Sequence, residues 1–472
     1  MYHNYSRNDF TFFNRGIARI DPRTGGLVHP LDTNSQAAYK RYGLLQEVYY
    51  RPSEGQVVSL KYWGQHAGRS IPRATSYEGP DHSNLNNQQD TDHKVVAEWK
   101  YYGDRTRWLM RSGFSGKKLV YVLRNRVPGL GQVPAIYSES HQTSLMNSVS
   151  FEREVGPDFS LKATLDVNVH RVSTHDSVSR EGYEGKRNEG SLFLSLAKGF
   201  GDRLNLNMML RQEIVDGKPV SLIPYLGFDY RLMEGTDLVL KGHVARNYHQ
   251  PSLNDLYWQP GGNPELQPEE GFTMETGLEY LCLFRGHSLR SALTLYRSDI
   301  RQWIIWIPSY RGYWEARNTD RVLSQGLELD AGLNGRIRSI GYRITGNYAY
   351  TSSVNYGNPQ VWGDASYGKQ LVYIPIHSGN LMFNLTFRGF FLTYQYNAYS
   401  ERFTTSSNDI TRRDWLYPYF MNDVAAGKKT RIGTLDVSAE LKVYNLFNET
   451  YHSILYRPMP GRNYNVVLMI GI

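Results

Sequence analysis

The sequence predicts an all-β fold: a large antiparallel β-barrel that spans a lipid bilayer. Three observations support this prediction. Apolar and polar residues alternate along many segments, tyrosine is overrepresented, and short turns alternate with long polar loops. A barrel of this kind exposes its apolar outer surface to lipid and encloses a polar interior.

The alternation is clearest in LKATLDVNVH, at residues 161–170. Because successive side chains of a β-strand point to opposite faces, this segment has one apolar face and one polar face. The same pattern returns at residues 204–211 and 435–444. An antiparallel sheet built from many such strands must cover its apolar face, and hydrocarbon provides that cover in a membrane barrel.

The composition agrees with a membrane barrel. The 472 residues include 36 Tyr, 18 Phe and 9 Trp, and such rings are enriched at the two boundaries between lipid and water. The sequence has no apolar run of about 18 residues, the length that a membrane-spanning helix needs. The net charge of +8 is spread over turns, loops and polar faces. This spread argues against nucleic-acid binding and favours contact with anionic lipid headgroups or an anionic ligand.

The connections divide into two kinds. Short segments rich in turn-forming residues lie at 53–55, 156–158, 201–202, 234–237, 285–286, 334–335, 388–389 and 426–429. Long polar loops are predicted at 67–91, 172–186, 248–270, 354–370 and 404–417. Bacterial outer-membrane barrels have short periplasmic turns and long extracellular loops. Together these connections delimit about twenty strands.

The sequence lacks motifs for catalysis. Its 13 histidines are dispersed, and it contains no HExxH, Cys-x-x-Cys, phosphate-binding glycine loop or Gly-x-Ser-x-Gly elbow. Asp166 and His170 share a polar face, which leaves a hydrolase site inside the barrel as an alternative. We therefore predict no enzymatic activity, no cofactor and no bound metal. We interpret Cys282 as a small apolar side chain rather than a reactive thiol.

Ligand contacts are expected in the long loops, because binding residues concentrate in loops. The run TRRDWLYPY at 411–419 places two arginines beside aromatic rings, which suits an anionic, planar or metal-chelate ligand. The predicted ligand-binding residues are Tyr183, Arg187, Tyr257, Trp258, Gln259, Arg412, Arg413, Trp415 and Tyr417. The alternative role for a Trp or Tyr at the base of a loop is in the aromatic belt at the lipid boundary.

Three segments resemble the TonB-dependent outer-membrane receptors. The first, residues 245–280, carries Arg246, Pro251, Leu256, Tyr257, Gly262, Asn263, Pro264, Pro268, Glu269, Glu275 and Gly277. The second begins at Val443 and carries Asn445, Leu446, Phe447, Pro460, Gly461 and Arg462. The third is QGLELD at 325–330. Taken together and in this order, the three segments give a resemblance to that family that spans most of the chain.

These motif residues have chemistry that favours structural roles. Pro264 and Pro268 restrict the backbone of the loop before the next strand, and Gly277 permits a bend or close packing within its strand. Glu275 falls on a polar face, where it either solvates the lumen or pairs with arginines of a plug. Roles in the rim and turns are expected for Asn445, Pro460 and Arg462.

The resemblance implies a larger architecture. Members of the family combine a 22-stranded barrel with a preceding plug and a TonB-contacting box, whereas this chain begins in barrel-like sequence. We therefore interpret residues 1–472 as one N-terminally truncated barrel domain without the plug. The implied location is the bacterial outer membrane. The implied function is active import of a ferric siderophore, cobalamin or a similar chelate.

The implied partners are outer-membrane lipid, the TonB complex acting through the plug, the barrel-assembly machinery and an external chelate ligand. The barrel itself is expected to be a monomer. Two alternatives share the strands and the aromatic belts: a passive porin, and an adhesive or structural barrel. A porin conducts ions without a plug, and an adhesive barrel shows no energy-dependent uptake.

Overall fold

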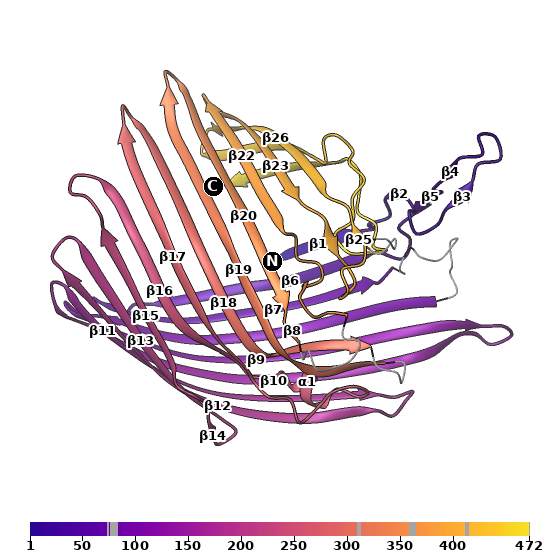
Figure 1. The fold of residues 1–472 in the computed structure, drawn as a ribbon, viewed down its shortest axis with the longest axis horizontal. Helices are drawn as coiled ribbons and strands as arrows, with labels where there is room; N and C mark the ends of the chain where they lie inside the picture. Colours follow the sequence, from indigo (N-terminus) through magenta and orange to yellow (C-terminus); the bar gives the residue numbers. More distant parts are fainter. Residues whose placement is uncertain (73–74, 76–83, 309–312, 358–364, 411–414, 472) are drawn as a thin grey trace.

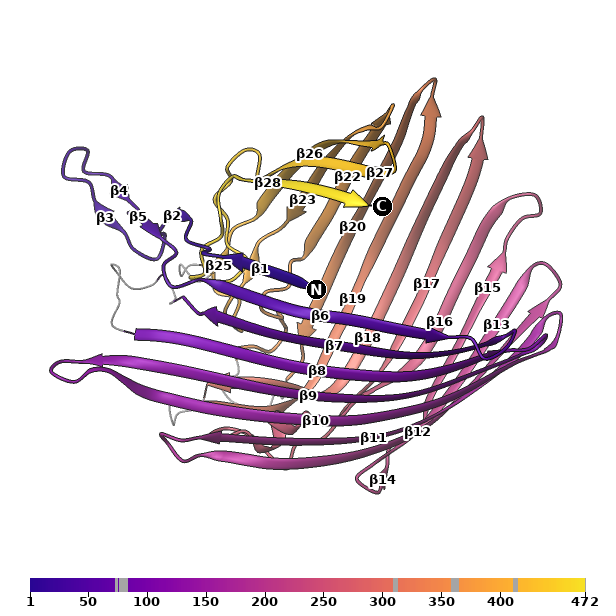
Figure 2. The same ribbon diagram turned by 180° about the vertical axis from the view of Figure 1, so that it is seen from behind.

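The computed structural model describes residues 1–472 except 73–74, 76–83, 309–312, 358–364, 411–414 and 472. The described chain is almost entirely antiparallel β-structure, which confirms the predicted all-β class. The strands form one wide sheet that curls round, so that β1 and β28 lie on the same side (Figures 1 and 2). In the described part of the chain, no helix is long and apolar enough to cross a bilayer.

The longer strands of the wall follow one another along the chain. They are β1 (Tyr2–Ser6), β6 (Tyr39–Tyr50), β7 (Gln56–Ser70), β8 (Asn84–Tyr102), β9 (Thr106–Val127), β10 (Gly131–Gly156), β11 (Phe159–Asp176), β12 (Gly182–Phe200), β13 (Leu204–Val215), β15 (Ile223–Arg231), β16 (Asp237–His249), β17 (Glu269–Phe284), β18 (His287–Pro308), β19 (Trp314–Ile337), β20 (Ile340–Asn355), β22 (His377–Phe387), β23 (Phe390–Tyr399), β26 (Tyr419–Ile432), β27 (Leu435–Tyr444) and β28 (Asn463–Gly471).

The remaining elements are short. They are β2 (Thr11–Phe13), β3 (Arg19–Ile20), β4 (Leu27–Val28), β5 (Leu31–Thr33), β14 (Lys218–Pro219), β21 (Lys369–Gln370), β24 (Arg402–Phe403), β25 (Trp415–Leu416) and the helix α1 (Leu253–Tyr257). Of these, β14 and β21 join the wall, which has 22 strands among the described residues. Twenty longer strands therefore remain, in agreement with the predicted number.

Each longer strand pairs antiparallel with its neighbour in the chain, and the registers run from β1 through β6 to β28. Tight turns make this pairing possible. At the turn after β22, Arg388 and Gly389 both have positive φ angles, of 47° and 84°. A Cβ atom on Gly389 would lie 2.4 Å from the Lys429 carbonyl oxygen. This turn therefore needs a glycine, both for its backbone conformation and for the close approach.

Side chains alternate between two faces of the wall. On β11, the apolar side chains Leu165 and Val167 are 52% and 49% exposed. Asp166, between them, points to the other face, where its carboxylate accepts a hydrogen bond from Ser191 Oγ at 3.1 Å. The exposed apolar side chains lie on the outward face of the curled wall, and the polar side chains line its inner face, as is typical of a membrane barrel. The observed alternation confirms the pattern predicted from the sequence.

Two predicted loops are shorter than expected. Most of residues 172–186 continue β11 and β12, and the connection between these strands is confined to 177–181. The predicted loop 67–91 shrinks to 71–83, because β7 and β8 extend into it. The prediction was wrong here because a strand that projects beyond the lipid is polar on both faces and reads like a loop.

Two predicted turns also lie within strands. Residues 334–335 belong to β19, and residues 426–429 belong to β26. Within β26, a Cβ atom on Gly427 would lie 2.5 Å from the ring of Phe391 on the neighbouring strand. Glycine in this strand therefore permits a large ring to lie across the backbone and does not mark a turn.

Replacing Leu165 by Arg is expected to lower the free energy of unfolding by about 2–4 kcal/mol, the cost of a basic side chain on the lipid face near the bilayer centre. Denaturant unfolding in lipid vesicles measures this change. Asn168→Arg, on the lumen face of the same strand, is the control and is expected to change the free energy by about 0.5 kcal/mol or less. Equal losses in the two variants would contradict the assignment of the faces.

Candidate functional site

The loop between β16 and β17 is folded around α1. Ser252 caps this helix: its hydroxyl accepts a hydrogen bond from Asp255 N at 3.1 Å, and the Asp255 carboxylate accepts one from Ser252 N at 2.8 Å. These reciprocal bonds satisfy backbone donors at the start of the helix. The other Asp255 oxygen accepts a hydrogen bond from Trp306 Nε1 at 2.8 Å, which ties the helix to β18.

The same loop is anchored to the lumen face of β12. The Arg187 guanidinium is buried and donates a hydrogen bond to the Pro251 carbonyl oxygen at 2.6 Å. The Tyr183 hydroxyl donates to the Asn254 side-chain oxygen, and the ring of Tyr183 lies 6.2 Å from that of Tyr257. The loop therefore extends from β12 to β18 at the long-loop end of the barrel.

A cavity of about 640 Å³ lies beneath this loop. The lumen faces of β9, β10, β11 and β12 supply most of its wall, and the loop adds Asn254, Trp258, Gln259 and Pro260. The wall is mixed. Lys117, Gln142 and Asp176 are its polar side chains, and Leu119, Ile136, Val172 and the rings of Tyr121 and Tyr183 are among its apolar ones. We call this space the mouth cavity.

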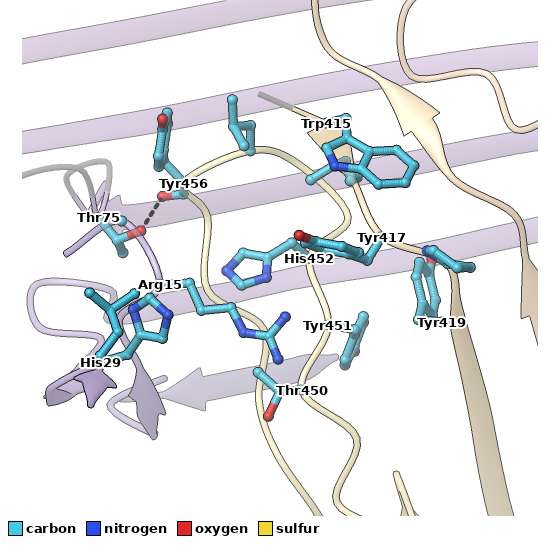
Figure 3. Close-up of a pocket in the computed structure, with 15 residues that line it drawn as sticks. Arg15, His29, Thr75, Trp415, Tyr417, Tyr419, Thr450, Tyr451, His452 and Tyr456 are labelled. Carbon is cyan, nitrogen blue, oxygen red and sulfur yellow. Dashed lines mark hydrogen bonds between the residues drawn. The ribbon is translucent and has the colours of Figure 1, made fainter. Parts of the chain in front are cut away.

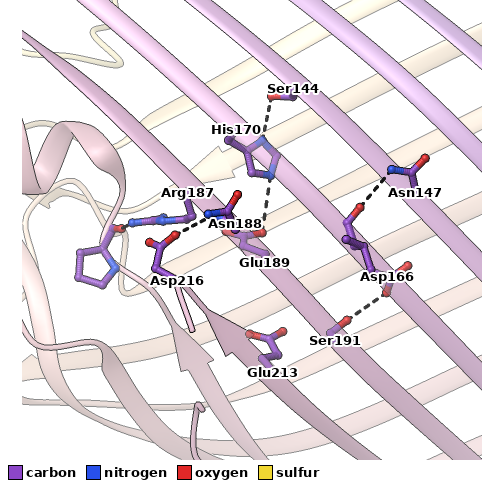
Figure 4. A network of polar contacts seen from close by, with 12 residues as sticks. Ser144, Asn147, Asp166, His170, Arg187, Asn188, Glu189, Ser191, Glu213 and Asp216 are labelled. Carbon is purple, nitrogen blue, oxygen red and sulfur yellow. Dashed lines mark hydrogen bonds and ion pairs between the residues drawn. The ribbon is translucent and has the colours of Figure 1, made fainter. Parts of the chain in front are cut away.

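Further down the lumen, polar side chains form rows across β10, β11 and β12 (Figure 4). His170 Nδ1 lies 2.8 Å from Ser144 Oγ, and its Nε2 lies 3.6 Å from a Glu189 carboxylate oxygen. Ser144 is buried, and β10 pairs with strands on both sides, so its backbone N–H groups serve the sheet. Since acyl transfer needs free donors to stabilise an oxyanion, this row favours a solvated lumen wall over a hydrolase site.

A second cavity of about 220 Å³ lies among loops that are distant in the sequence (Figure 3). Arg15 and His29 come from the segment between β1 and β6, and Trp415 and Tyr417 come from the segment between β23 and β26. Thr75, between β7 and β8, and residues 450–452 and 455–456, between β27 and β28, also line it. We call this space the loop pocket.

Backbone and aromatic contacts hold the loop pocket together. Thr75 N donates a hydrogen bond to the Tyr456 carbonyl oxygen at 2.9 Å. Arg402 donates to the carbonyl oxygens of His452 and Ser453, at 2.7 and 3.2 Å, and lies over the ring of Tyr419. This guanidinium is buried, so the loss of either acceptor would leave a buried N–H donor without a hydrogen bond, at a cost in stability.

Burial sets the electrostatics of the loop pocket. It lowers the pKa of His452, and the nearby positive charge of Arg15 lowers it further. Burial also raises the pKa of the Tyr451 phenol. Both groups are therefore neutral near pH 7, and Arg15 supplies positive charge to this pocket.

The predicted ligand-binding residues fall into separate groups. Tyr183, Trp258 and Gln259 line the mouth cavity, whereas Trp415 and Tyr417 line the loop pocket. Tyr183 and Arg187 were predicted in a loop but lie in β12, because that strand projects beyond the lipid. Arg187 is buried beneath the loop and Tyr257 lies against the ring of Tyr183, and neither is among the residues that line the mouth cavity or the loop pocket. Arg412 and Arg413 lie outside the described residues.

Sequence reasoning missed the cationic and imidazole groups that line the loop pocket, Arg15 and His452, and the buried Arg402 that holds one of its segments. Arg15, Arg402 and His452 come from three segments, and none of the three segments has a motif that predicts their contact. A folded backbone is needed to bring them together. In the described part of the chain, no group of three or more His, Cys, Asp or Glu side chains is placed to hold a metal ion.

The motif residues of the first segment make contacts within the wall and the loop. Glu269 accepts a hydrogen bond from Ile304 N at 2.7 Å. Glu275 lies 3.8 Å from His243 on the lumen face. At Gly277 and Gly262, a Cβ atom would come within 2.7 and 2.6 Å of backbone atoms of Leu293 and Trp258.

The motif residues near the C-terminus organise the segment before β28. Asn445 is fully buried; its side chain donates to Glu449 O and accepts from Glu449 N, at 2.8 and 2.7 Å. Asn448 accepts a hydrogen bond from Arg462 N at 2.8 Å. A Cβ atom on Gly461 would lie 2.6 Å from that Asn448 oxygen. These contacts set the path of the chain beneath the loop pocket.

A wide antiparallel wall with an apolar outer face, a polar lumen and loops gathered at one end defines a large outer-membrane barrel. Residues 3–446 match the family described as "TonB dependent receptor-like, beta-barrel", and the chain belongs to this family. Its location is accordingly the outer membrane of Gram-negative bacteria.

Individual relatives are more distant. The chain is 28% identical over 221 residues to the vitamin B12 transporter BtuB of Photobacterium profundum, a match that covers 46% of this chain and 32% of the relative. It is 33% identical over 89 residues to BtuB of Vibrio vulnificus, which covers 19% of this chain and 14% of the relative. The chain thus spans about a third or less of these relatives.

The fold is similar to that of the crystal structure of the ferric-catecholate import receptor Fiu from K12 E. coli, with a TM-score of 0.70 at 14% identity. That match covers 94% of this chain and 77% of the receptor chain.

We expect His452 to titrate with a midpoint below the ordinary histidine value of about 6.5. The neutral, buried His452 ring then contributes its full stabilisation at pH values above the ordinary histidine pKa. This contribution is lost as the pH falls through the lower midpoint of the folded protein. Histidine ring signals in NMR spectra, assigned with His452→Asn, measure the midpoint. Arg15→Gln is expected to raise it by removing a nearby charge, whereas Arg23→Gln in the same segment leaves it unchanged. A midpoint at or above the ordinary value would contradict the buried position.

Proposed function

We propose that this barrel takes part in ligand-specific import across the outer membrane, and that its ligand is a large metal chelate of the cobalamin or ferric siderophore class. The observation that carries the proposal is the mouth cavity. Its wall combines the lumen faces of barrel strands with the folded loop that holds Trp258 and Gln259. A ligand held there contacts the wall of the barrel and a loop that is anchored to both β12 and β18.

The chemistry of the two cavities supports a ligand that is flat, polar at its edge and partly anionic. Aromatic rings provide stacking surfaces in both cavities, at Trp258 and Tyr183 in one and at Trp415 and Tyr417 in the other. Arg15 adds positive charge to the loop pocket, and Lys117 adds it to the mouth cavity. Rings with adjacent cations suit a planar chelate with carboxylate, phosphate or catecholate groups.

The relatives give the order in which ligands should be tested. Those found by sequence are vitamin B12 transporters, so cyanocobalamin comes first. A ferric catecholate comes second, because the similar solved structure is that of a ferric-catecholate import receptor.

Transport requires more than binding to the barrel wall. As the resemblance to TonB-dependent receptors implies, we propose that a plug closes the lumen and that the TonB complex moves this plug when ligand is bound. The polar rows of the lumen provide the surface that such a plug would contact. In this proposal the barrel is monomeric, and the barrel-assembly machinery inserts it.

The binding test compares two tryptophans of similar exposure. Trp258 is 38% exposed and lines the mouth cavity, whereas Trp108 is 36% exposed and lies on the outward face beside Phe151. Trp258→Ala is expected to weaken binding of cyanocobalamin or a ferric catecholate by about tenfold or more, as for an aromatic contact at the centre of an interface. Trp108→Ala is expected to leave the affinity unchanged. Isothermal titration in detergent measures both.

Two results would contradict the proposal. One is the absence of saturable binding for both chelates, and the other is an equal loss of affinity in the two variants. A passive porin gives the first result. Ligand uptake by cells distinguishes an importer from an adhesive barrel. Cells with an energised importer accumulate ligand and stop when the proton gradient is removed, whereas an adhesive barrel shows no energy-dependent uptake.

A further inference from the structure

The outward face of the wall carries a group of arginines on β16, β18 and β19. They are Arg246, Arg297, Arg301 and Arg321. Two carboxylates, Glu270 and Asp299, lie on the same face, so that four positive charges accompany two negative ones. We call this surface the arginine patch. It is separate from both cavities and from the lumen.

The register shows that the patch faces outward. Arg297 is directly opposite Met274, and Asp299 is opposite Phe272. Met274 and Phe272 are 57% and 50% exposed apolar side chains, which places them on the surface that contacts lipid. Arg246 is opposite Phe272 from the other side. The charged groups therefore share a face with the hydrocarbon-facing residues and adjoin them directly.

The patch lies at the outer boundary of the apolar band. On β18, Arg297 follows His287 by ten residues, and His287 lies beside the ring of Phe284 at the short-turn end. Ten residues rise about 33 Å along a strand, and a tilt of about 40° reduces this to about 25 Å, the height of the apolar band of such barrels. With His287 at the periplasmic boundary, Arg297 and Arg301 reach the headgroups of the outer leaflet.

Two of the arginines are held by the carboxylates. Arg246 forms an ion pair with Glu270 at 2.5 Å. Arg321 donates from Nε to Asp299 at 2.7 Å and forms a second bond through its terminal nitrogen. Each carboxylate is thus satisfied by one guanidinium in a fixed geometry.

The other two arginines are available. Arg297 and Arg301 flank Asp299 on the same strand face, and both side chains are exposed. Neither forms a hydrogen bond or an ion pair with another of the described residues. Two guanidinium groups without acceptors, next to exposed Phe and Met side chains, form a surface that is complementary to an anionic headgroup with acyl chains.

We propose that the arginine patch binds a lipid of the outer leaflet whose headgroup carries phosphate. Arg297 and Arg301 donate to the phosphate oxygens, which accept two parallel N–H bonds from a guanidinium. The acyl chains lie along Phe272, Met274 and Leu295, the last of which is 48% exposed. Asp299 and Glu270 fix Arg321 and Arg246 and so reduce the repulsion among the four cations.

The position of the patch favours a lipid over a soluble anion. Its arginines adjoin the apolar band, so lipid headgroups are the nearest source of phosphate. The acyl chains add apolar contact that a free phosphate lacks. The proposal depends on the outward face of the barrel and does not depend on the imported ligand.

The test uses the full chain in detergent, titrated with diphosphoryl lipid A and followed by native mass spectrometry. Arg297→Gln combined with Arg301→Gln is expected to weaken lipid binding by about tenfold to a hundredfold, since hydrogen bonds to charged groups contribute about 1.5–3 kcal/mol each. Arg338→Gln combined with Arg388→Gln removes the same charge from the short turns at the opposite end. This control is expected to leave the affinity unchanged. Circular dichroism verifies that both variants are folded.

Three outcomes would overturn the proposal. The first is unchanged affinity in the Arg297/Arg301 variant, and the second is an equal loss in the control. The third is complete displacement of the lipid by millimolar inorganic phosphate, which would identify a site for a free anion. Retention of lipid A in the presence of phosphate, together with its loss in the patch variant, supports a lipid site.

Discussion

Every feature of this protein depends on the alternation of side chains across a single sheet. A membrane barrel has no second layer against which to bury apolar groups, so each strand must present lipid with one face and water with the other. The backbone polar groups are satisfied by pairing each strand with its neighbours. Strand register therefore decides the function of each side chain, because a shift by one residue would exchange the lumen and lipid faces.

The cavities arise where this regular pattern ends. Above the lipid the strands continue with polar residues on both faces, and loops fold back onto their inner surface. The loop around α1 is the clearest example, since Arg187 and Trp306 fasten it to two different parts of the wall. The mouth cavity is therefore rigid on the side of the strands and also on the side of the loop, which distinguishes it from a surface made of free loops.

The sequence predicts the wall well because the alternation is local. The faces of residues 161–170, the approximate strand number and the family follow from patterns within short segments. The extent of β11 and β12 was not predictable in the same way, because residues 172–186 are polar on both faces once they leave the lipid. The loop pocket was beyond prediction for another reason: Arg15, Arg402 and His452 are brought together by the curvature of the whole sheet.

The loop pocket joins the first and last portions of the chain. Its lining includes Arg15 and Tyr456, whose neighbouring strands β1 and β28 are at opposite ends of the order of pairing. Contacts between such remote segments form late, since the intervening chain must be ordered first. The pocket is consequently a marker of completed folding. A barrel arrested part of the way through assembly would lack it, however well its central hairpins were formed.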